Sequence, residues 1–234
     1  MDVKDKRAVV FGGTSGIGLA AARQLAALGA EVVAISRDPS KAGDPGQGIR
    51  LEQCDVRDEA GLQQLFERLK PFDILVSAAT GGRRAAGPFL EMDMAGFRAS
   101  FDKLWGYANV VRYGAPHLAE HGCIVLVSGA PARRTKPGQI ALGAVGGAVE
   151  QFARGVAPEL APRRINVVSP GTIDTPMVTL SGGERRAAYE RMTKNNLIPR
   201  AGTADEVAQA IVFAVQNDFV TGTTIDVDGG WLLA

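Results

Sequence analysis

The hydrophobic pattern of the chain alternates between short β-branched runs and longer stretches rich in alanine and leucine. The short runs predict buried strands at residues 8–11, 31–35, 49–54, 74–76, 124–127, 165–168 and 224–227. The longer stretches predict helices at residues 18–28, 59–69, 95–115, 148–160 and 204–215. Strand–helix alternation implies right-handed parallel crossovers, so we expect one α/β domain over residues 1–234, with a doubly wound parallel sheet of about seven strands.

A long excursion, residues 172–201, separates the last two expected strands, and residues 184–194 within it predict one more helix. Segments that follow the carboxyl ends of parallel strands often bind ligands, so we expect a substrate lid here. A surface ornament is the alternative. Residues 181–200 carry five basic and two acidic side chains, which would suit an acidic substrate. A solvated amphipathic face explains them at least as well.

The composition argues against nucleic-acid and membrane-surface binding. The 234 residues include 26 Lys+Arg against 25 Asp+Glu, a net charge of +1, whereas both functions depend on excess positive charge. The apolar stretches are well short of the ~20 residues of a membrane span, and the charged N-terminus does not resemble a signal peptide. Cys54 and Cys123 lie in or beside apolar stretches, and neither is part of a CxxC motif. We therefore expect buried reduced thiols, no metal site and a cytoplasmic location.

The strongest motif joins the first expected strand to the first expected helix: Gly12-Gly13-Thr14-Ser15-Gly16-Ile17-Gly18. Gly12 permits the turn, Gly16 lets the backbone approach a pyrophosphate, and Gly18 lets the helix pack on the sheet. The start of the helix offers N–H groups and a positive dipole end to phosphate. This context predicts a dinucleotide-binding, Rossmann-type domain. A glycine-rich turn without a ligand is the alternative.

The tip of the second expected strand carries the sequence Ser36-Arg37-Asp38. An acidic residue at the tip would bind the ribose 2′-hydroxyl of NAD, whereas a hydroxyl beside a permanent cation suits the 2′-phosphate of NADP. We therefore expect NADP(H) as the cofactor, bound there by Ser36 and Arg37. A solvated Arg37 in a loop is the alternative.

Four further segments follow in order: Asp55-Val56, Leu75-Val76-Ser77-Ala78-Ala79, Ser169-Pro170-Gly171-Thr172 and Val227-Asp228-Gly229-Gly230. Together with the glycine motif they resemble the short-chain dehydrogenase/reductase family, over nearly the whole chain. The resemblance implies that Asp55 and Val56 contact the adenine ring, that Ala78 and Ala79 border the cofactor, and that Pro170, Gly171 and Thr172 lie beside the nicotinamide amide. It also implies a homotetramer or homodimer packed through the fourth and fifth helices.

The chain departs from that family at all four of its reactive positions. The family uses an asparagine on the fourth helix, a serine after the fifth strand, and a tyrosine followed four residues later by a lysine. The corresponding positions hold Lys103, Gly129, Leu142 and Gly146. In the family the tyrosine exchanges a proton with the substrate oxygen and the lysine lowers its pKa. Leu142 cannot exchange a proton, so a reaction here needs another donor or none.

Lys103 is the first candidate donor, because burial lowers a lysine pKa toward neutrality. A structural salt bridge, or filling of the vacated space, is the alternative. Tyr107, one helical turn later, would reach the same pocket, although helix packing explains it more simply. Ser128 precedes the expected serine position by one residue and should point to the opposite face of its strand. The loop cations that follow are expected to face water rather than an anionic substrate: Arg133, Arg134 and Lys136.

These observations predict an NADP(H)-dependent oxidoreductase that acts on an alcohol or carbonyl compound, with an anionic substrate left open, by a non-standard proton route. Two alternatives remain open. One is a catalytically silent NADP(H)-binding sensor or assembly subunit, which any stereospecific hydride transfer would exclude. The other is a lyase or isomerase, which would form product with no net change in cofactor redox state.

Overall fold

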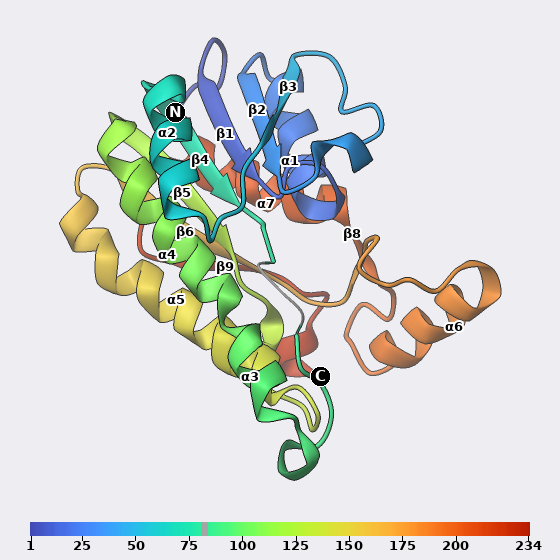
Figure 1. Cartoon of the computed structure of the whole chain (residues 1–234). Helices are drawn as coiled ribbons and strands as arrows, with labels where there is room; N and C mark the ends of the chain where they lie inside the picture. Colours follow the sequence, from blue (N-terminus) through green and yellow to red (C-terminus); the bar gives the residue numbers. More distant parts are fainter. Residues whose placement is uncertain (81–83) are drawn as a thin grey trace.

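A seven-stranded parallel sheet, ordered β3-β2-β1-β4-β5-β6-β9, forms the centre of the structure, a computed structural model that describes residues 1–80 and 84–234 (Figure 1). The strands are β1 (Arg7–Phe11), β2 (Glu31–Ser36), β3 (Ile49–Gln53), β4 (Phe72–Ser77), β5 (Leu118–Val127), β6 (Arg164–Pro170) and β9 (Thr224–Val227). Strand order reverses between β1 and β4. In doubly wound sheets such a reversal opens a crevice at the carboxyl ends of the strands, where ligands bind. All seven predicted strands are confirmed.

Helices cover both faces of the sheet, with α2, α4 and α5 on one face and α1 and α7 on the other (Figure 1). The helices are α1 (Gly16–Ala27), α2 (Glu59–Leu69), α3 (Met94–Ser100), α4 (Asp102–Gly114), α5 (Ile140–Leu160), α6 (Gly182–Thr193) and α7 (Ala204–Gln216). Within β1, Val9 and Phe11 enter the core under α2 and α4, whereas Ala8 and Val10 enter the core under α1 and α7. Burial on both faces explains the continuous apolar runs that predict the strands.

Two helix boundaries differ from the predictions. The single helix expected at residues 95–115 divides into α3 and α4 at Phe101, whose N–H donates to the Arg98 carbonyl three residues earlier and tightens the turn. The helix expected from residue 148 begins at Ile140. Glycines disfavour a helix there, but loop 129–135 packs directly on them: a Cβ at Gly146 would lie 2.9 Å from the Ala132 Cβ. Close packing therefore overrides local propensity.

The excursion between β6 and α7 carries α6, which extends away from the main sheet (Figure 1). Two short strands, β7 (Ile173–Asp174) and β8 (Gly202–Thr203), pair in parallel at its base, where the Gly202 N–H donates to the Thr172 carbonyl at 2.9 Å. The helix expected at residues 184–194 is therefore present as α6, displaced by one or two residues.

Both cysteines are buried and free, and burial raises the pKa of each thiol to about 11. The expectation of buried thiols at Cys54 and Cys123 is confirmed. Across the described residues, no three His, Cys, Asp or Glu side chains gather as metal ligands would. Nor does any helix in that part of the chain combine the length and apolarity needed to cross a membrane.

Candidate functional site

Two adjoining hollows open at the carboxyl ends of the strands. The glycine-loop groove, about 430 Å³, lies over the turn after β1 and the tip of β2. The inner cavity, about 280 Å³, lies between α4, α5, the end of β5 and α6. They share the wall residues Ile17, Ala78, Thr80, Thr175 and Met177. A ligand with two ends would therefore reach from one hollow into the other.

The glycine-loop groove is shaped by two glycines that tolerate no side chain. Gly12 has a φ of +74°, and a Cβ there would lie 2.8 Å from the Ala78 carbonyl carbon. A Cβ on Gly18 would overlap the Gly12 carbonyl group, 2.6 Å from its carbon. Ser15 is the N-cap residue of α1, and its side chain makes no capping hydrogen bond within the described chain. The first turn of α1 carries no acidic residue. The N–H groups there can therefore bind a phosphate.

The tip of β2 fits a 2′-phosphate better than a free ribose hydroxyl. The Ser36 Oγ is buried and has no hydrogen-bond partner in the described chain, whereas Arg37 is exposed beside it. The Asp38 carboxylate, which would otherwise repel a phosphate, pairs with Lys41 at 2.8 Å and accepts from the Ser40 hydroxyl. The hydrogen bond from Lys41 is the main reason that the Asp38 pKa is lowered. A phosphate would supply the acceptor that Ser36 lacks.

Most of the predicted cofactor residues lie in the two hollows. Those in the groove are Gly12, Thr14, Ser15, Gly16, Ile17, Gly18, Ser36, Arg37, Val56, Ala78 and Ala79, and those in the inner cavity include Pro170, Gly171 and Thr172. Asp55 is not among the groove residues. Its carboxylate accepts from the Arg57 backbone N–H at 2.9 Å and from the Arg57 guanidinium at 3.2 Å. Its adenine contact therefore stays a prediction.

Lys103 projects from α4 into the inner cavity and is 6% exposed. Its Nζ donates to the Ser128 carbonyl oxygen at 3.0 Å. Burial, and secondarily the nearby charge of Arg84, hold the Lys103 pKa well below its usual 10.5. No carboxylate of the described chain pairs with Lys103, so the structure does not support the salt-bridge interpretation. Lys103 is therefore a buried amine that lines the inner cavity and has no carboxylate partner in the described chain.

Tyr107 lines the same cavity, but its hydroxyl is engaged elsewhere. The Tyr107 OH donates to the Val127 carbonyl at 3.1 Å, and burial raises its pKa far above 10. The Lys103 Nζ lies 5.5 Å from the centre of the Tyr107 ring. These contacts favour a packing role for Tyr107, with its ring forming one wall beside the amine.

Ser128 directly follows Val127, the last residue of β5. Its side chain is predicted to point away from the cavity, and the contact of its hydroxyl agrees with that prediction. Ser128 lines the inner cavity, and its Oγ donates to the buried Glu150 carboxylate at 2.9 Å. Glu150 is 3.4 Å from the Arg133 Nε. Glu150 is not among the residues that line the cavity, so it is the Ser128 carbonyl, bonded to Lys103, that borders the cavity amine.

The loop cations lie outside the lining of the inner cavity, and Arg133 and Arg134 are exposed, in line with the prediction that they do not face a substrate, but all three also contact the chain. Arg133 pairs with the Asp226 carboxylate. Arg134 donates to the Trp231 carbonyl at 3.3 Å, and the Lys136 ammonium lies 3.6 Å from the centre of the Trp231 ring. These three cations therefore hold the C-terminal segment against the loop after β5.

Sequence reasoning missed Arg84 and Glu150. Arg84 follows β4 and lines the inner cavity. The available signal was its place after the carboxyl end of a central strand, where ligands bind. Glu150 is a single charge inside an apolar helical stretch, and such a residue is rarely buried without a partner. Leu142 and Gly146 both line the cavity as well, so the vacated catalytic positions do face it.

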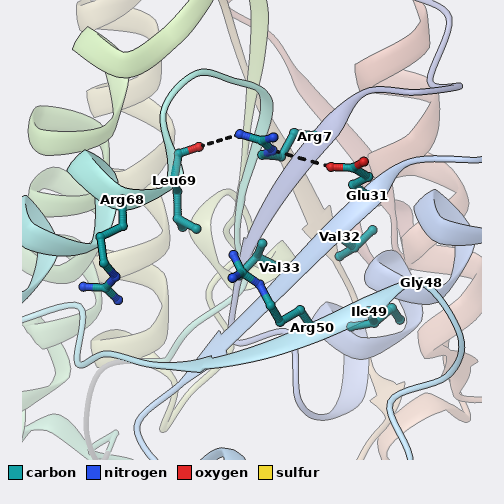
Figure 2. Close-up of a pocket in the computed structure, with 9 residues that line it drawn as sticks. All are labelled: Arg7, Glu31, Val32, Val33, Gly48, Ile49, Arg50, Arg68 and Leu69. Carbon is teal, nitrogen blue, oxygen red and sulfur yellow. Dashed lines mark hydrogen bonds and ion pairs between the residues drawn. The ribbon is translucent and has the colours of Figure 1, made fainter.

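A third hollow of about 570 Å³ lies at the other end of the sheet (Figure 2). Its arginines are engaged within the chain: Arg7 donates to the Leu69 carbonyl at 3.2 Å and lies 3.7 Å from Glu31. Arg50 and Arg68 both pair with Glu52. This hollow is larger than the other two, but it lies by the amino ends of β1 and β2, away from the glycine turn. We therefore place the candidate functional site in the glycine-loop groove and the inner cavity, at the carboxyl ends of the strands.

Comparison with known proteins agrees with this geometry. Residues 12–232 match the family model of enoyl-(acyl carrier protein) reductases. The chain is 30% identical to the 3-oxoacyl-[acyl-carrier-protein] reductase of Mus musculus, over 97% of this chain and 98% of that protein. A solved short chain dehydrogenase/reductase family protein is 34% identical over 100% of both chains, with a TM-score of 0.88. A small-chain dehydrogenase solved in complex with NADPH is 31% identical, covers 99% of this chain and 100% of its own, and has a TM-score of 0.83. The chain therefore belongs to the short-chain dehydrogenase/reductase family.

Proposed function

We propose that this protein is an NADP(H)-dependent oxidoreductase that interconverts an alcohol and a carbonyl compound, with Lys103 moving the proton. The observation that carries the proposal is the buried Lys103 amine, which lines the cavity adjoining the glycine-loop groove. NADP(H), when bound, supplies or accepts a hydride at its nicotinamide ring. The NADPH complex of the relative described above, the unpartnered Ser36 hydroxyl and the exposed Arg37 support the choice of cofactor.

Lys103 is placed to act as a general acid and base in the inner cavity. In the reducing direction its ammonium donates a proton to the substrate oxygen as that oxygen gains negative charge, and in the oxidising direction its neutral amine accepts the alcohol proton. Burial lowers the pKa of Lys103, so its amine loses its proton more readily than that of an exposed lysine, as a group that both donates and accepts a proton requires. The Ser128 carbonyl fixes the amine by one hydrogen bond and leaves its other hydrogens for the substrate.

The proposal is tested by isotope transfer. The protein is incubated with NADPH deuterated on one face of nicotinamide C4 and with a panel of aldehydes and ketones. We expect deuterium on one face of C4 to be transferred to the alcohol product, and deuterium on the other face to remain on the cofactor. If NADPH binds but no carbonyl compound in a broad panel acquires deuterium, the proposal fails and a binding protein becomes the better interpretation.

Replacing Arg37 with alanine should raise the Michaelis constant for NADPH by about 10–100-fold, because a charge-assisted hydrogen bond contributes about 1.5–3 kcal/mol. The turnover number should change little, since Arg37 lies in the groove and outside the inner cavity. Steady-state kinetics with NADPH and NADH provide the measurement. NADH lacks the 2′-phosphate and serves as the internal control, so an equal loss with both cofactors would contradict the role of Arg37.

Grafting the family's tyrosine and lysine by Leu142→Tyr and Gly146→Lys should not raise the turnover number. A side chain at position 146 would meet the Ala132 Cβ at 2.9 Å, and overpacking of this kind costs about 1–3 kcal/mol. The melting temperature and turnover number of the double variant provide the measurement. Adding Ala132→Gly should recover part of the lost melting temperature. A double variant that is faster than the parent and equally stable would show that loop 129–135 does not block this position.

A further inference from the structure

Arg84 is a half-buried guanidinium that has almost no hydrogen-bond acceptor within the described chain. Its Nε is buried without a hydrogen-bond partner in the described chain, and its Nη2 contacts the Met177 sulfur at 3.8 Å. A thioether is a weak acceptor, whereas a guanidinium has five N–H donors. Burial lowers the Arg84 pKa, which reflects the cost of removing its charge from water. This cost is unexplained if nothing ever binds to the side chain.

Elsewhere the chain gives a buried guanidinium several acceptors. Arg164 is 7% exposed, and it donates to the carbonyls of Ala214, Val215 and Val220 at 2.7–3.0 Å. The difference between the two arginines is their location. Arg164 lies inside the protein core, whereas Arg84 lines a cavity that opens beside the glycine-loop groove. Arg84 is therefore placed to bind something that enters the cavity.

Two basic side chains, and no carboxylate, are among the described residues that line the inner cavity. Its ionisable wall residues are Arg84, Lys103, Tyr107 and Tyr189, with no Asp or Glu among the described lining. Residues 81–83, outside the described part, are Gly-Gly-Arg in sequence and add no acid. Glu150 lies behind Ser128 and is already engaged by Ser128 and Arg133. An anion in the cavity would offset the charges of both cations.

We infer that the substrate is a compact oxo acid or hydroxy acid whose carboxylate is bound by Arg84, with its carbonyl or alcohol group beside Lys103. This inference rests on the proposed function, because it takes the inner cavity as the substrate site. The planar guanidinium fork matches the two carboxylate oxygens. The cavity holds about 280 Å³ and also includes Pro170 and Gly171, which are expected to border the nicotinamide. A carbon skeleton of a few atoms would therefore fill the remaining space.

Arg84 would also link substrate binding to the proton of Lys103. In the empty cavity the charge of Arg84 opposes protonation of the amine. A bound carboxylate offsets that charge and favours the ammonium form, so substrate binding would raise the charged fraction of the proton donor. A neutral ketone of the same size would bind without this effect.

The test compares acids with their neutral esters. The substrate probes are 2-oxobutanoate and 4-oxopentanoate, each beside its methyl ester, together with dihydroxyacetone phosphate, and kcat/KM is measured with NADPH. At least one acid should exceed its ester by about tenfold or more, because charge-assisted bonds are about twice as strong as neutral ones. Arg84→Gln should lower kcat/KM for the acid to the value found for its ester, and Arg84→Lys should give an intermediate kcat/KM. Arg98→Gln, which removes an exposed arginine of α3 outside the cavity, is the matched control and should change nothing.

The possible failures are distinguishable. Equal reduction of acid and ester, unchanged by Arg84→Gln, overturns the inference and leaves the proposed function standing. A preference for the phosphate ester over both acids overturns the carboxylate assignment. If no carbonyl compound is reduced, calorimetry of the two acids with the NADPH-loaded protein decides. Binding that is lost in Arg84→Gln and kept in Arg98→Gln supports the inference, and absence of binding to the parent overturns it.

Discussion

Lys103→Met should lower the turnover number by about 10²–10⁴-fold, the usual contribution of a general acid or base, while NADPH binds as tightly as before. Methionine keeps the length and apolar stem of lysine but cannot donate a proton. Lys103 lines the inner cavity and lies outside the glycine-loop groove, so the adenosine half of the cofactor loses no contact. Steady-state kinetics and calorimetric titration with NADPH measure the two effects separately.

The pH profile separates proton donation from a structural role. In the reducing direction the ammonium is the active form, so turnover should fall as pH rises through the Lys103 pKa, which burial holds well below 10.5. Lys103→Arg should lose this falling limb, because a guanidinium stays charged throughout. Unchanged turnover in Lys103→Met, or an unchanged limb in Lys103→Arg, would remove Lys103 from the mechanism.

Lys103→Met should also raise the melting temperature of the protein at neutral pH. The folded pKa of Lys103 lies below the value of about 10.4 in the unfolded chain. Between these two values the unfolded chain binds more protons, so the parent gains stability as pH rises. Below the folded pKa the full cost of the buried charge is present. The advantage of Lys103→Met should therefore be largest at low pH and shrink toward pH 10, offset by a constant loss of the bond to the Ser128 carbonyl.

The sheet and the cofactor groove were predictable because local signals determine them. Each buried strand is a continuous apolar run, and parallel connection brings the ends of all such strands to one edge. Gly12 and Ser36 lie 24 positions apart in the sequence. Gly12 comes directly after the end of β1 and Ser36 is the last residue of β2, so the ends of these two strands place both residues in the groove. Leu142 and Gly146, which the resemblance to the family matches to its tyrosine and lysine, both line the inner cavity.

The inner cavity was less predictable because long-range packing sets it. The contacts of Ser128 depend on the end of β5 one residue earlier and on Glu150 of α5, whose carboxylate accepts the Ser128 hydroxyl. The start of α5 depends on loop 129–135 packing against glycines that disfavour a helix when considered alone. Arg84 becomes conspicuous only when the absence of acceptors around it, within the described chain, is known. None of these contacts leaves a periodic signal in the sequence.

Gly18→Ala should damage both the fold and the cofactor groove. The added methyl group would overlap the Gly12 carbonyl, 2.6 Å from its carbon, and neither backbone segment can move away. α1 is packed on the sheet through Ala21 and Leu25, and Gly12 donates its N–H to the Ile35 carbonyl at 2.8 Å. We expect a loss of at least about 1–3 kcal/mol of stability, which corresponds to about 2–12 °C in melting temperature for a chain of this size.

NADPH affinity should fall together with stability in Gly18→Ala, because separating α1 from the glycine turn misplaces the N–H groups that would hold the pyrophosphate. Gly155→Ala is the matched control. Gly155 is an exposed residue within α5, and a Cβ there would meet nothing within 4 Å. The same substitution should stabilise the protein by about 0.5–1 kcal/mol at that position. If calorimetry and thermal melts find the two variants alike, the close contact between Gly18 and Gly12 does not shape the groove, and phosphate binding by the start of α1 loses its structural basis.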